Sequence, residues 1–196
     1  MQTDQPTHTT PAPIGTSAEE AQLIMRLQNP ETRNFAFDQV VRSYQEMLYY
    51  HIRRIVRSHD DADDVLQNAL MKAWRNIDKF RGDAQLKTWL YRIATNESLN
   101  HLRKNKKQNH QELANLEDNL QYSQQNSTQM SGAEIQQKLK AALATLPERQ
   151  LLVFNMRYYD EMKYDQISEV LQVTVGALKA SYHHAVKKIE KHLTSH

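Results

Sequence analysis

Residues 61–107 read DADDVLQNALMKAWRNIDKFRGDAQLKTWLYRIATNESLNHLRKNKK, and this stretch decides the fold. Its first half places apolar residues three and four positions apart, at Leu66, Ala69, Leu70, Ala73, Trp74 and Ile77. Its second half repeats the spacing with Leu86, Trp89, Leu90, Ile93 and Ala94. Such spacing puts each set on one face of an α-helix. The stretch therefore predicts two amphipathic helices that meet at a turn containing Gly82.

The positions of proline and glycine extend this interpretation to the whole chain. The five prolines stand at positions 6, 11, 13, 30 and 147, and only Gly82 and Gly132 interrupt the interval between the last two. Proline breaks helix interiors and glycine weakens them, so this interval permits long helices. No segment within it alternates apolar and polar residues in the manner of a strand. We therefore expect an all-α protein.

Composition divides the chain into two small helical domains joined by a flexible linker. Residues 1–16 are rich in Thr and Pro and are expected to form a disordered tail. Residues 17–107 are the first expected domain, and residues 131–196 are the second. Between them, residues 108–130 consist mainly of Asn, Gln and Ser, and their charged residues are all acidic. This composition is typical of a linker.

Local signals predict the helix boundaries of the first domain. Ser17 and Glu20 have capping-box spacing and predict a short helix that ends near Asn29. Residues 31–58 predict a long helix. Residues 58–64, SHDDADD, predict a polar break whose aspartates cap the helix that follows.

Charge and cysteine content exclude several classes of protein. Lys and Arg total 25 against 23 Asp and Glu, a net charge of +2, so nucleic-acid binding has to come from local patches. The absence of cysteine excludes disulfides, cysteine zinc sites and thiol catalysis, and fits a reducing compartment. No apolar run reaches the ~18 residues of a membrane span, and the N-terminus lacks the pattern of a secretory signal. We expect a cytoplasmic protein without membrane insertion.

No pattern in the sequence indicates an enzyme, a cofactor or a metal centre. The nine histidines show no HExxH or similar ligand spacing, and the chain has no P-loop, GxSxG or GxGxxG motif. Aspartates cluster at positions 60, 61, 63 and 64, but they lack the spacing and the glycine of an EF-hand loop. Helix capping or a protein contact is therefore the preferred interpretation of this cluster.

The C-terminal segment has the pattern of a helix-turn-helix. Residues 163–172 predict a short helix, which is followed by the tight turn QVT and by a longer helix over residues 174–193. Opposite its apolar stripe the longer helix carries a capping residue and small or cationic residues that suit a DNA major groove: Thr174, Gly176, Ala177, Lys179, Ala180, His183 and Lys187. Taken alone, this helix fits an ordinary amphipathic helix with a solvated lysine face equally well. The short helix and the turn before it favour helix-turn-helix.

A second basic helix lies in the first domain. Residues 85–107 carry six Lys or Arg and one acid, a local charge of +5. One helix face, directed away from Leu90, gathers Gln85, Arg92, Asn96 and Arg103. Among the nearby aromatic residues, Trp89 lies on the apolar stripe and is interpreted as core, whereas Phe80 and Tyr91 are expected to be freer. Aromatic and basic side chains together suit single-stranded DNA, although a charge run is more often a solvated face.

Together, the two basic helices and their surroundings resemble a known family. DADDVLQNALMKAW followed by FRGDAQLKTWLYRIATNESLNHLRKNK resembles conserved region 2 of RNA polymerase sigma factors of the extracytoplasmic-function group. ALATLPERQLLVFNMRYYDEMKYDQISEVLQVTVGALKASYHHAVKKIEKHL resembles region 4 of the same group. The resemblance spans residues 31–107 and 135–193, and the order of the two regions without a domain between them is specific for this group. It implies a factor that binds core RNA polymerase, through the β′ and β subunits, and directs promoter-specific initiation.

The resemblance also implies a role for individual residues. Contacts with core polymerase match Asp61, Asp64, Gln67 and Asn68, the last of which stands where the family usually has Glu. Recognition and melting of the −10 element match Phe80, Arg81, Gly82, Asp83, Gln85, Arg92, Asn96, Arg103 and Lys104. Recognition of the −35 duplex matches the seven residues between Thr174 and Lys187 given above. Promoter DNA and an anti-sigma factor are the further partners, the linker 108–130 extends toward the polymerase active-site cleft, and the free protein is a monomer.

A stand-alone helix-turn-helix regulator is the alternative interpretation. In that case residues 17–107 sense a ligand or dimerise, and the protein needs palindromic sites but no polymerase. Melting DNA costs roughly a few kcal/mol per unstacked base pair, which two small basic patches do not supply alone. Two tethered contacts on a larger assembly gain from effective concentration, so the sigma-factor interpretation explains why modest patches suffice.

Overall fold

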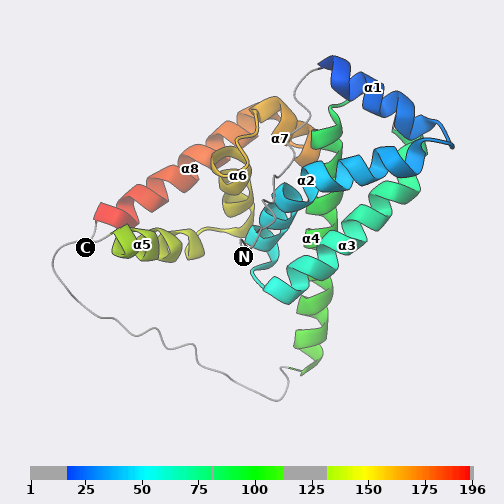
Figure 1. Cartoon of the computed structure of the whole chain (residues 1–196). Helices are drawn as coiled ribbons and strands as arrows, with labels where there is room; N and C mark the ends of the chain where they lie inside the picture. The colour runs from blue at the N-terminus through cyan, green and yellow to red at the C-terminus, as the bar shows by residue number, and fades with distance from the viewer. Residues whose placement is uncertain (1–16, 81, 113–131, 195–196) are drawn as a thin grey trace, which may run out of the picture. The chain divides into compact units, whose positions relative to one another are not determined.

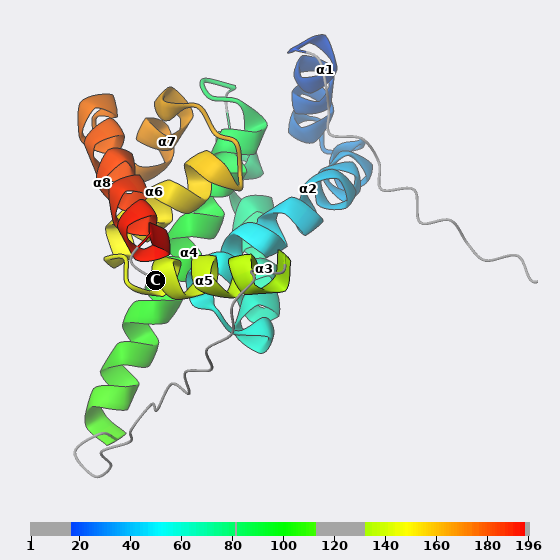
Figure 2. The same cartoon turned by 90° about the vertical axis from the view of Figure 1, so that its left-hand side faces the viewer.

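The computed structural model describes residues 17–80, 82–112 and 132–194, and every regular element within these ranges is a helix (Figures 1 and 2). The elements follow the chain in the order α1 (Ser17–Gln28), α2 (Arg33–Val56), α3 (His59–Asn76), the short 3-10 helix η1 (Ile77–Lys79), α4 (Leu86–Glu112), α5 (Gly132–Ala144), α6 (Glu148–Tyr158), α7 (Tyr164–Leu171) and α8 (Val175–Thr194). The expected all-α class is confirmed. Within the described ranges, no helix has both the length and the apolar composition needed to cross a membrane.

The helices form two compact units, and the division between Leu99 and Asn100 falls inside α4. α4 continues to Glu112, so the first five residues of the segment expected to be a linker are helical. The expected tail (1–16) and the remainder of the expected linker (113–130) lie outside the described residues.

The first unit is organised around α2, which buries one or two residues in almost every turn: Ala36, Phe37, Val40, Tyr44, Leu48, His51, Ile52 and Val56. α3 lies beside α2 in both views (Figures 1 and 2) and buries only smaller residues: Ala62, Val65, Ala69 and Ala73. Small side chains allow two helix axes to approach closely. The larger residues of the α3 stripe consequently lie at the edge of the contact, where Leu66 and Leu70 are half-buried and Trp74 is exposed.

Buried polar groups connect α2 with α4. His51 Nε2 lies 2.9 Å from Thr95 Oγ1, and the His51 ring centroid lies 4.7 Å from that of Tyr91. All three side chains are buried, and the Thr95 hydroxyl is the hydrogen-bond partner that the buried His51 imidazole needs. Tyr44 is another buried polar residue of α2. Burial, and to a lesser extent the negative charge of Glu20 on α1, raises the pKa of Tyr44 to about 12.

The expected polar break over residues 58–64 is wrong, because α3 already begins at His59. α2 ends with Arg57 in the left-handed region (φ +67°), and Ser58 is the N-cap of α3, with its Oγ accepting from the Asp61 N–H at 3.4 Å. Asp60 and Asp61 lie in the first turn, where negative charge favours the helix dipole. The aspartates therefore begin the helix rather than separate it from α2, and the serine is the cap.

The second unit packs α5 and α6 against α8, with α7 leading into α8. Its core contains Ala142, Leu146, Phe154, Ala185 and Ile189. α7 ends at a left-handed Gln172 (φ +55°), and Thr174 Oγ1 accepts from the Ala177 N–H at 3.4 Å at the start of α8. The predicted helix-turn-helix, including its threonine cap, is confirmed.

Candidate nucleic-acid interface

α8 presents the residues predicted for duplex DNA on its exposed side. Gly176, Ala177, Lys179, Ala180, His183 and Lys187 are all exposed, and so is Thr174 at the cap. On the other side of the helix, Leu178, Ala185 and Ile189 are buried in the core of the second unit. The apolar side therefore fixes the helix in place and leaves a surface of small and cationic residues for a partner. This is the surface that a major-groove helix requires.

An aromatic ring from α7 lies beside the predicted recognition residues. Lys179 Nζ lies 5.9 Å from the centroid of the Tyr164 ring, and the Arg157 guanidinium carbon lies 5.3 Å from the same centroid. Arg157 also donates to the Met162 carbonyl at 3.0 Å. Two cations thus share one half-buried ring, which favours a limited set of positions for the Lys179 ammonium.

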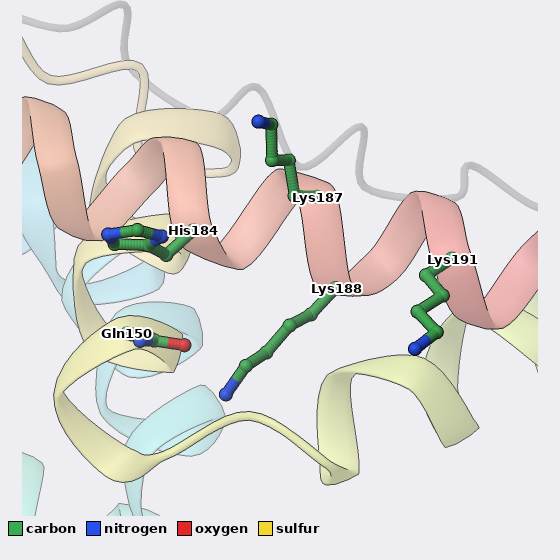
Figure 3. A pocket seen from close by; sticks show the side chains of 5 residues that line it. All are labelled: Gln150, His184, Lys187, Lys188 and Lys191. Atoms are coloured by element: carbon green, nitrogen blue, oxygen red, sulfur yellow. The ribbon is translucent and has the colours of Figure 1, made fainter.

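A second basic surface on α8 was not predicted. Gln150 of α6 together with His184, Lys187, Lys188 and Lys191 of α8 line a groove of about 410 Å³ (Figure 3). Lys188 extends from α8 toward α6, whereas Lys187 projects from the opposite side of the helix (Figure 3). The groove shares one residue, Lys187, with the predicted recognition residues. The spacing of His184, Lys188 and Lys191, four and three positions apart, was the available sequence signal.

The predicted face of α4 is also exposed. Arg92, Asn96, Arg103 and Lys104 are exposed along the helix, and Gln85 is exposed just before its first residue. The acid in this stretch, Glu97, is directed elsewhere, because it accepts from Lys72 of α3 at 2.6 Å. The polar face of α4 is consequently left with positive charge and amide groups, which suits a nucleic-acid backbone and base edges.

The turn before α4 contains the glycine that the sequence singled out. Gly82 has φ +79°, in the left-handed region where a side chain is strained, so glycine is required there. Gly82 and Asp83 are exposed. Arg81, which was also predicted to meet DNA, lies outside the described residues.

The expectation that Phe80 and Tyr91 are freer than Trp89 is wrong. The Phe80 side chain is 5% exposed and its ring centroid lies 5.0 Å from that of Trp89, while Tyr91 is 0% exposed. Trp89 is itself buried, as predicted. Stacking of bases on the Phe80 ring is therefore not available in this structure, because the ring belongs to the core beneath the turn.

The α3 residues predicted for core polymerase lie on a surface of mixed character. Asp64, Gln67 and Asn68 are exposed, and Asp61 is half-buried. Gln67 also lines a groove of about 380 Å³ between α2 and α3, together with Asn34, Phe37, Asp38, Leu70, Met71 and Trp74. Trp74 is 37% exposed, with its ring centroid 5.1 Å from that of Phe37. Sequence periodicity placed Trp74 on the apolar stripe and gave no sign that part of the ring faces solvent.

Both units match conserved regions of one family. The sequence model of Sigma-70 region 2 matches residues 40–108, and that of Sigma-70 region 4 matches residues 136–189. Two of the solved structures that share the fold are complexes. One is the sigma factor RpoE in complex with the anti-sigma factor NepR from Bartonella quintana, with a TM-score of 0.65 and 22% identity over 80% of this chain and 96% of that chain. The other is CnrH in complex with the cytosolic domain of CnrY, with a TM-score of 0.66 and 20% identity over 90% of this chain and 97% of that chain.

Several sigma factors match this chain over most of its length. RNA polymerase sigma-H factor of Pseudomonas aeruginosa is 31% identical, over 91% of this chain and 95% of the relative. The ECF RNA polymerase sigma factor SigW of Bacillus subtilis is 30% identical, over 81% of this chain and 89% of the relative. The ECF RNA polymerase sigma-E factor of Escherichia coli K12 is 30% identical, over 86% and 91%. The two basic helices therefore lie almost entirely within the two conserved regions that match. The chain belongs to the extracytoplasmic-function group of the sigma-70 family of RNA polymerase sigma factors.

Proposed function

We propose that the two units divide the work of promoter recognition by the polymerase holoenzyme. Residues 17–107 bind core polymerase and the melted −10 element, residues 131–196 read the −35 element as duplex, and residues 108–130 connect them. The observation that carries this proposal is the exposed polar face on each of α4 and α8, held in place by a buried apolar stripe. As in the family, the protein acts as an initiation factor in the cytoplasm, where core polymerase works.

Core polymerase binds the α3 surface in this proposal. Asp64 and Gln67 provide polar contacts at exposed positions, and the neighbouring groove offers Trp74 and Met71 for apolar contact. Interfaces commonly combine an aromatic anchor with a polar rim, which is the arrangement of this surface. Asn68, which replaces the usual glutamate, keeps a hydrogen-bonding side chain but no charge.

The −10 element binds α4 and the turn before it. Arg92, Asn96 and Arg103 extend over roughly 16 Å of helix axis, long enough to follow several nucleotides of a separated strand. The cations meet phosphates, and the exposed amide of Asn96 is suited to a base edge. Gly82, Asp83 and Gln85 lie at the end where a flipped base is held. With the Phe80 ring buried, base recognition at the turn rests on polar groups rather than on stacking.

The −35 element binds α8. The small residues Gly176, Ala177 and Ala180 permit close approach of the helix to the major groove. Lys179 and His183 are the exposed polar side chains at the depth of the bases, and Lys187 lies one to two turns further along, where a phosphate contact is expected.

In vitro transcription with purified core polymerase on a promoter library tests the proposal. Addition of the protein should select a set of start sites that core polymerase alone does not use. The stand-alone regulator predicts no such selection, together with a dimer in sedimentation, whereas the sigma factor predicts a monomer. If core polymerase initiates no better with the protein than without it, the proposed function is wrong.

An anti-sigma factor is the further partner that we propose. The α2–α3 groove leaves Met71 and Trp74 exposed in the free protein, and such apolar surface suits a protein inhibitor that competes with polymerase. One structure of the same fold is a sigma factor in complex with an anti-sigma factor. Co-purification from the native host, with the Trp74→Ala variant as the comparison, identifies such a partner.

A further inference from the structure

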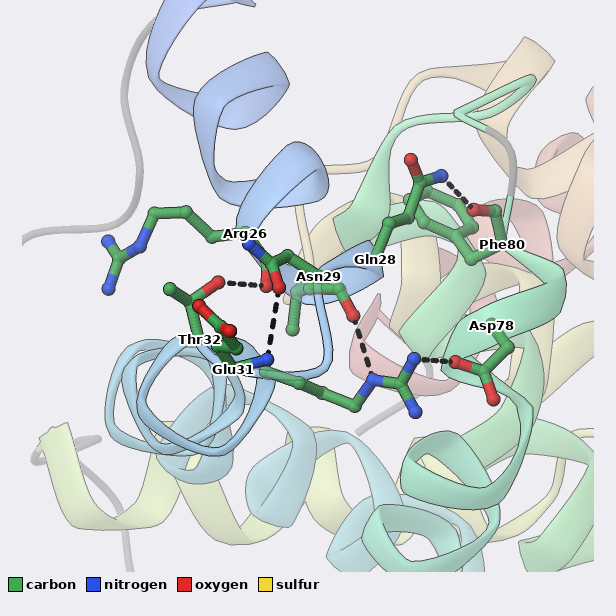
Figure 4. A network of polar contacts seen from close by, with 9 residues as sticks. Arg26, Gln28, Asn29, Glu31, Thr32, Asp78 and Phe80 are labelled. Atoms are coloured by element: carbon green, nitrogen blue, oxygen red, sulfur yellow. Dashed lines mark hydrogen bonds and ion pairs between the residues drawn. The ribbon is translucent and has the colours of Figure 1, made fainter.

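α1 contacts both ends of the segment that leads from η1 into α4. At the first end, Gln28 Nε2 of α1 donates to the Phe80 carbonyl at 3.2 Å (Figure 4). At the second end, the Leu86 N–H donates to Glu20 Oε1 of α1 at 2.5 Å. Residues that are 52 and 66 positions apart in sequence are thereby joined. α1 precedes the residues matched by the region 2 model, which begins at residue 40.

The end of α1 is itself fixed to α2 and η1. Thr32 Oγ1 donates to the Arg26 carbonyl at 2.8 Å, and Arg33 Nε donates to the Leu27 carbonyl at 3.1 Å. Arg33 also forms an ion pair with Asp78 of η1, which is drawn as the dashed line that ends at Asp78 in Figure 4. α1 is therefore a supported element, and its own apolar residues Leu23 and Leu27 are buried.

These contacts lie on either side of Gly82 in the sequence. Gly82 is in the left-handed region, and glycine allows many backbone conformations, so the shape of the turn depends on what holds its ends. α4 begins at Leu86 with N–H groups that have no partner within the helix. The Glu20 carboxylate accepts from one of them and places a negative charge at the positive end of the helix dipole.

We propose that α1 holds the turn between Phe80 and Leu86 in the conformation that binds the melted strand. Glu20 and Gln28 are the positioning residues. The inference rests on the proposed binding of the −10 element at this turn. Neither residue needs to touch DNA. Because melting is costly, a turn already held in its binding conformation adds affinity by reducing what has to be ordered on capture.

The experiment uses holoenzyme assembled from core polymerase and full-length protein. The probe is a single-stranded oligonucleotide that carries the non-template −10 sequence of a promoter selected by the wild-type holoenzyme. Glu20→Ala and Gln28→Ala should each weaken its binding about three- to tenfold, the effect of one lost hydrogen bond. Binding of core polymerase and of a −35 duplex should stay within about twofold, because α3 and α8 are untouched.

Conservative and control variants distinguish positioning from a general loss of structure. Glu20→Gln keeps a carbonyl acceptor for the Leu86 N–H and should restore most of the affinity. Gln22→Ala, an exposed change on the same helix, should have no effect. Gln28 is exposed, so its alanine variant folds and tests the inference even if Glu20→Ala does not.

The outcomes separate the inference from the proposal beneath it. If wild-type holoenzyme binds the oligonucleotide and both alanine variants bind it equally well, the positioning role of α1 is refuted. The assignment of the −10 element to this turn then stands. If the alanine variants lose binding of core polymerase and of both DNA elements to the same degree, α1 only supports the fold of the first unit. The positioning role of α1 is then also refuted. If wild-type holoenzyme does not bind the oligonucleotide, the turn does not bind the −10 element as proposed. The positioning role of α1 is then refuted as well.

Discussion

Lys179 gives the sharpest quantitative test of −35 recognition by α8. Its side chain is exposed, and its Nζ lies 5.9 Å from the centroid of the Tyr164 ring, which Arg157 approaches at 5.3 Å. A cation over an aromatic ring at an exposed site gains roughly 0.5–1 kcal/mol. The ring therefore biases the position of the ammonium group before DNA arrives, and leaves its charge in solvent.

Lys179→Ala should weaken binding of the −35 duplex by about 1 kcal/mol or more, which is about fivefold or more in Kd. The salt dependence identifies what the lysine touches. For a phosphate contact, the loss is similar for all sequences and the slope of log K against log salt falls by about 1. For a base contact, the loss depends on the sequence and the slope changes little. Tyr164→Leu should cost about two- to fivefold by releasing Lys179, whereas Tyr164→Phe should keep the affinity.

Fluorescence anisotropy of a labelled −35 duplex, titrated with holoenzyme at several salt concentrations, measures these effects. The double variant shows whether the ring acts through the lysine, because Tyr164→Leu should then cost nothing further when Lys179 is alanine. Lys140→Ala, an exposed lysine of α5 in the same unit, is the matched control. Unchanged affinity of Lys179→Ala at every salt concentration would remove Lys179 from the interface. Equal losses from Tyr164→Leu with and without Lys179 would show that the ring only supports the fold.

Three further predictions concern the first unit. Asp64→Ala combined with Gln67→Ala should reduce binding of core polymerase and leave the thermal unfolding temperature unchanged; normal co-purification with polymerase refutes this contact. Ser58→Ala should lower the free energy of unfolding by about 1 kcal/mol in urea, because α3 loses its cap, and an unchanged midpoint contradicts that role. Burial raises the pKa of Tyr44 to about 12, from about 10 when unfolded, so the neutral hydroxyl favours the folded state fully below pH 10. Between pH 10 and 12 the wild type should lose roughly 2–3 kcal/mol relative to Tyr44→Phe, and parallel stability curves of the two proteins would exclude this.

Helical periodicity predicted the fold because each helix needs one apolar stripe, and residues three and four positions apart in sequence define that stripe. The α8 stripe and the α4 stripe were identified from spacing, and the side opposite each one is exposed. The threonine cap of α8 was also local, because Thr174 lies only three residues before the N–H that it accepts from. Features that depend on neighbours within about one helical turn are therefore accessible to sequence analysis.

The errors lie where distant segments decide the outcome. Phe80 and Tyr91 lie off the apolar spacing of α4, but Phe80 packs against Trp89, on the buried stripe of α4, and Tyr91 packs against His51 of α2. The contacts of Glu20 and Gln28 with the turn join residues far apart in the chain, and periodicity carries no information about them. The acidic break was a different error, because the local signal was present. Ser58 followed by acids is a helix start, but the density of charge suggested a loop.

The same surfaces suggest why this sigma factor depends on its partner. A few exposed cations on one helix bind duplex DNA weakly, and most of that affinity is lost as salt rises. In the proposed function, the apolar groove lined by Trp74 gives α3 a separate source of binding energy for core polymerase, one that salt does not screen. If α3 docks on core polymerase as proposed, α8 then searches for the −35 element at the effective concentration set by the chain between the units. A variant at Asp64 and Gln67 should consequently lower occupancy of the −10 and −35 elements by the same factor without touching DNA, whereas Lys179→Ala should lower −35 occupancy alone. Unequal effects of the α3 variant on the two elements would mean that docking and DNA binding are not coupled in this way.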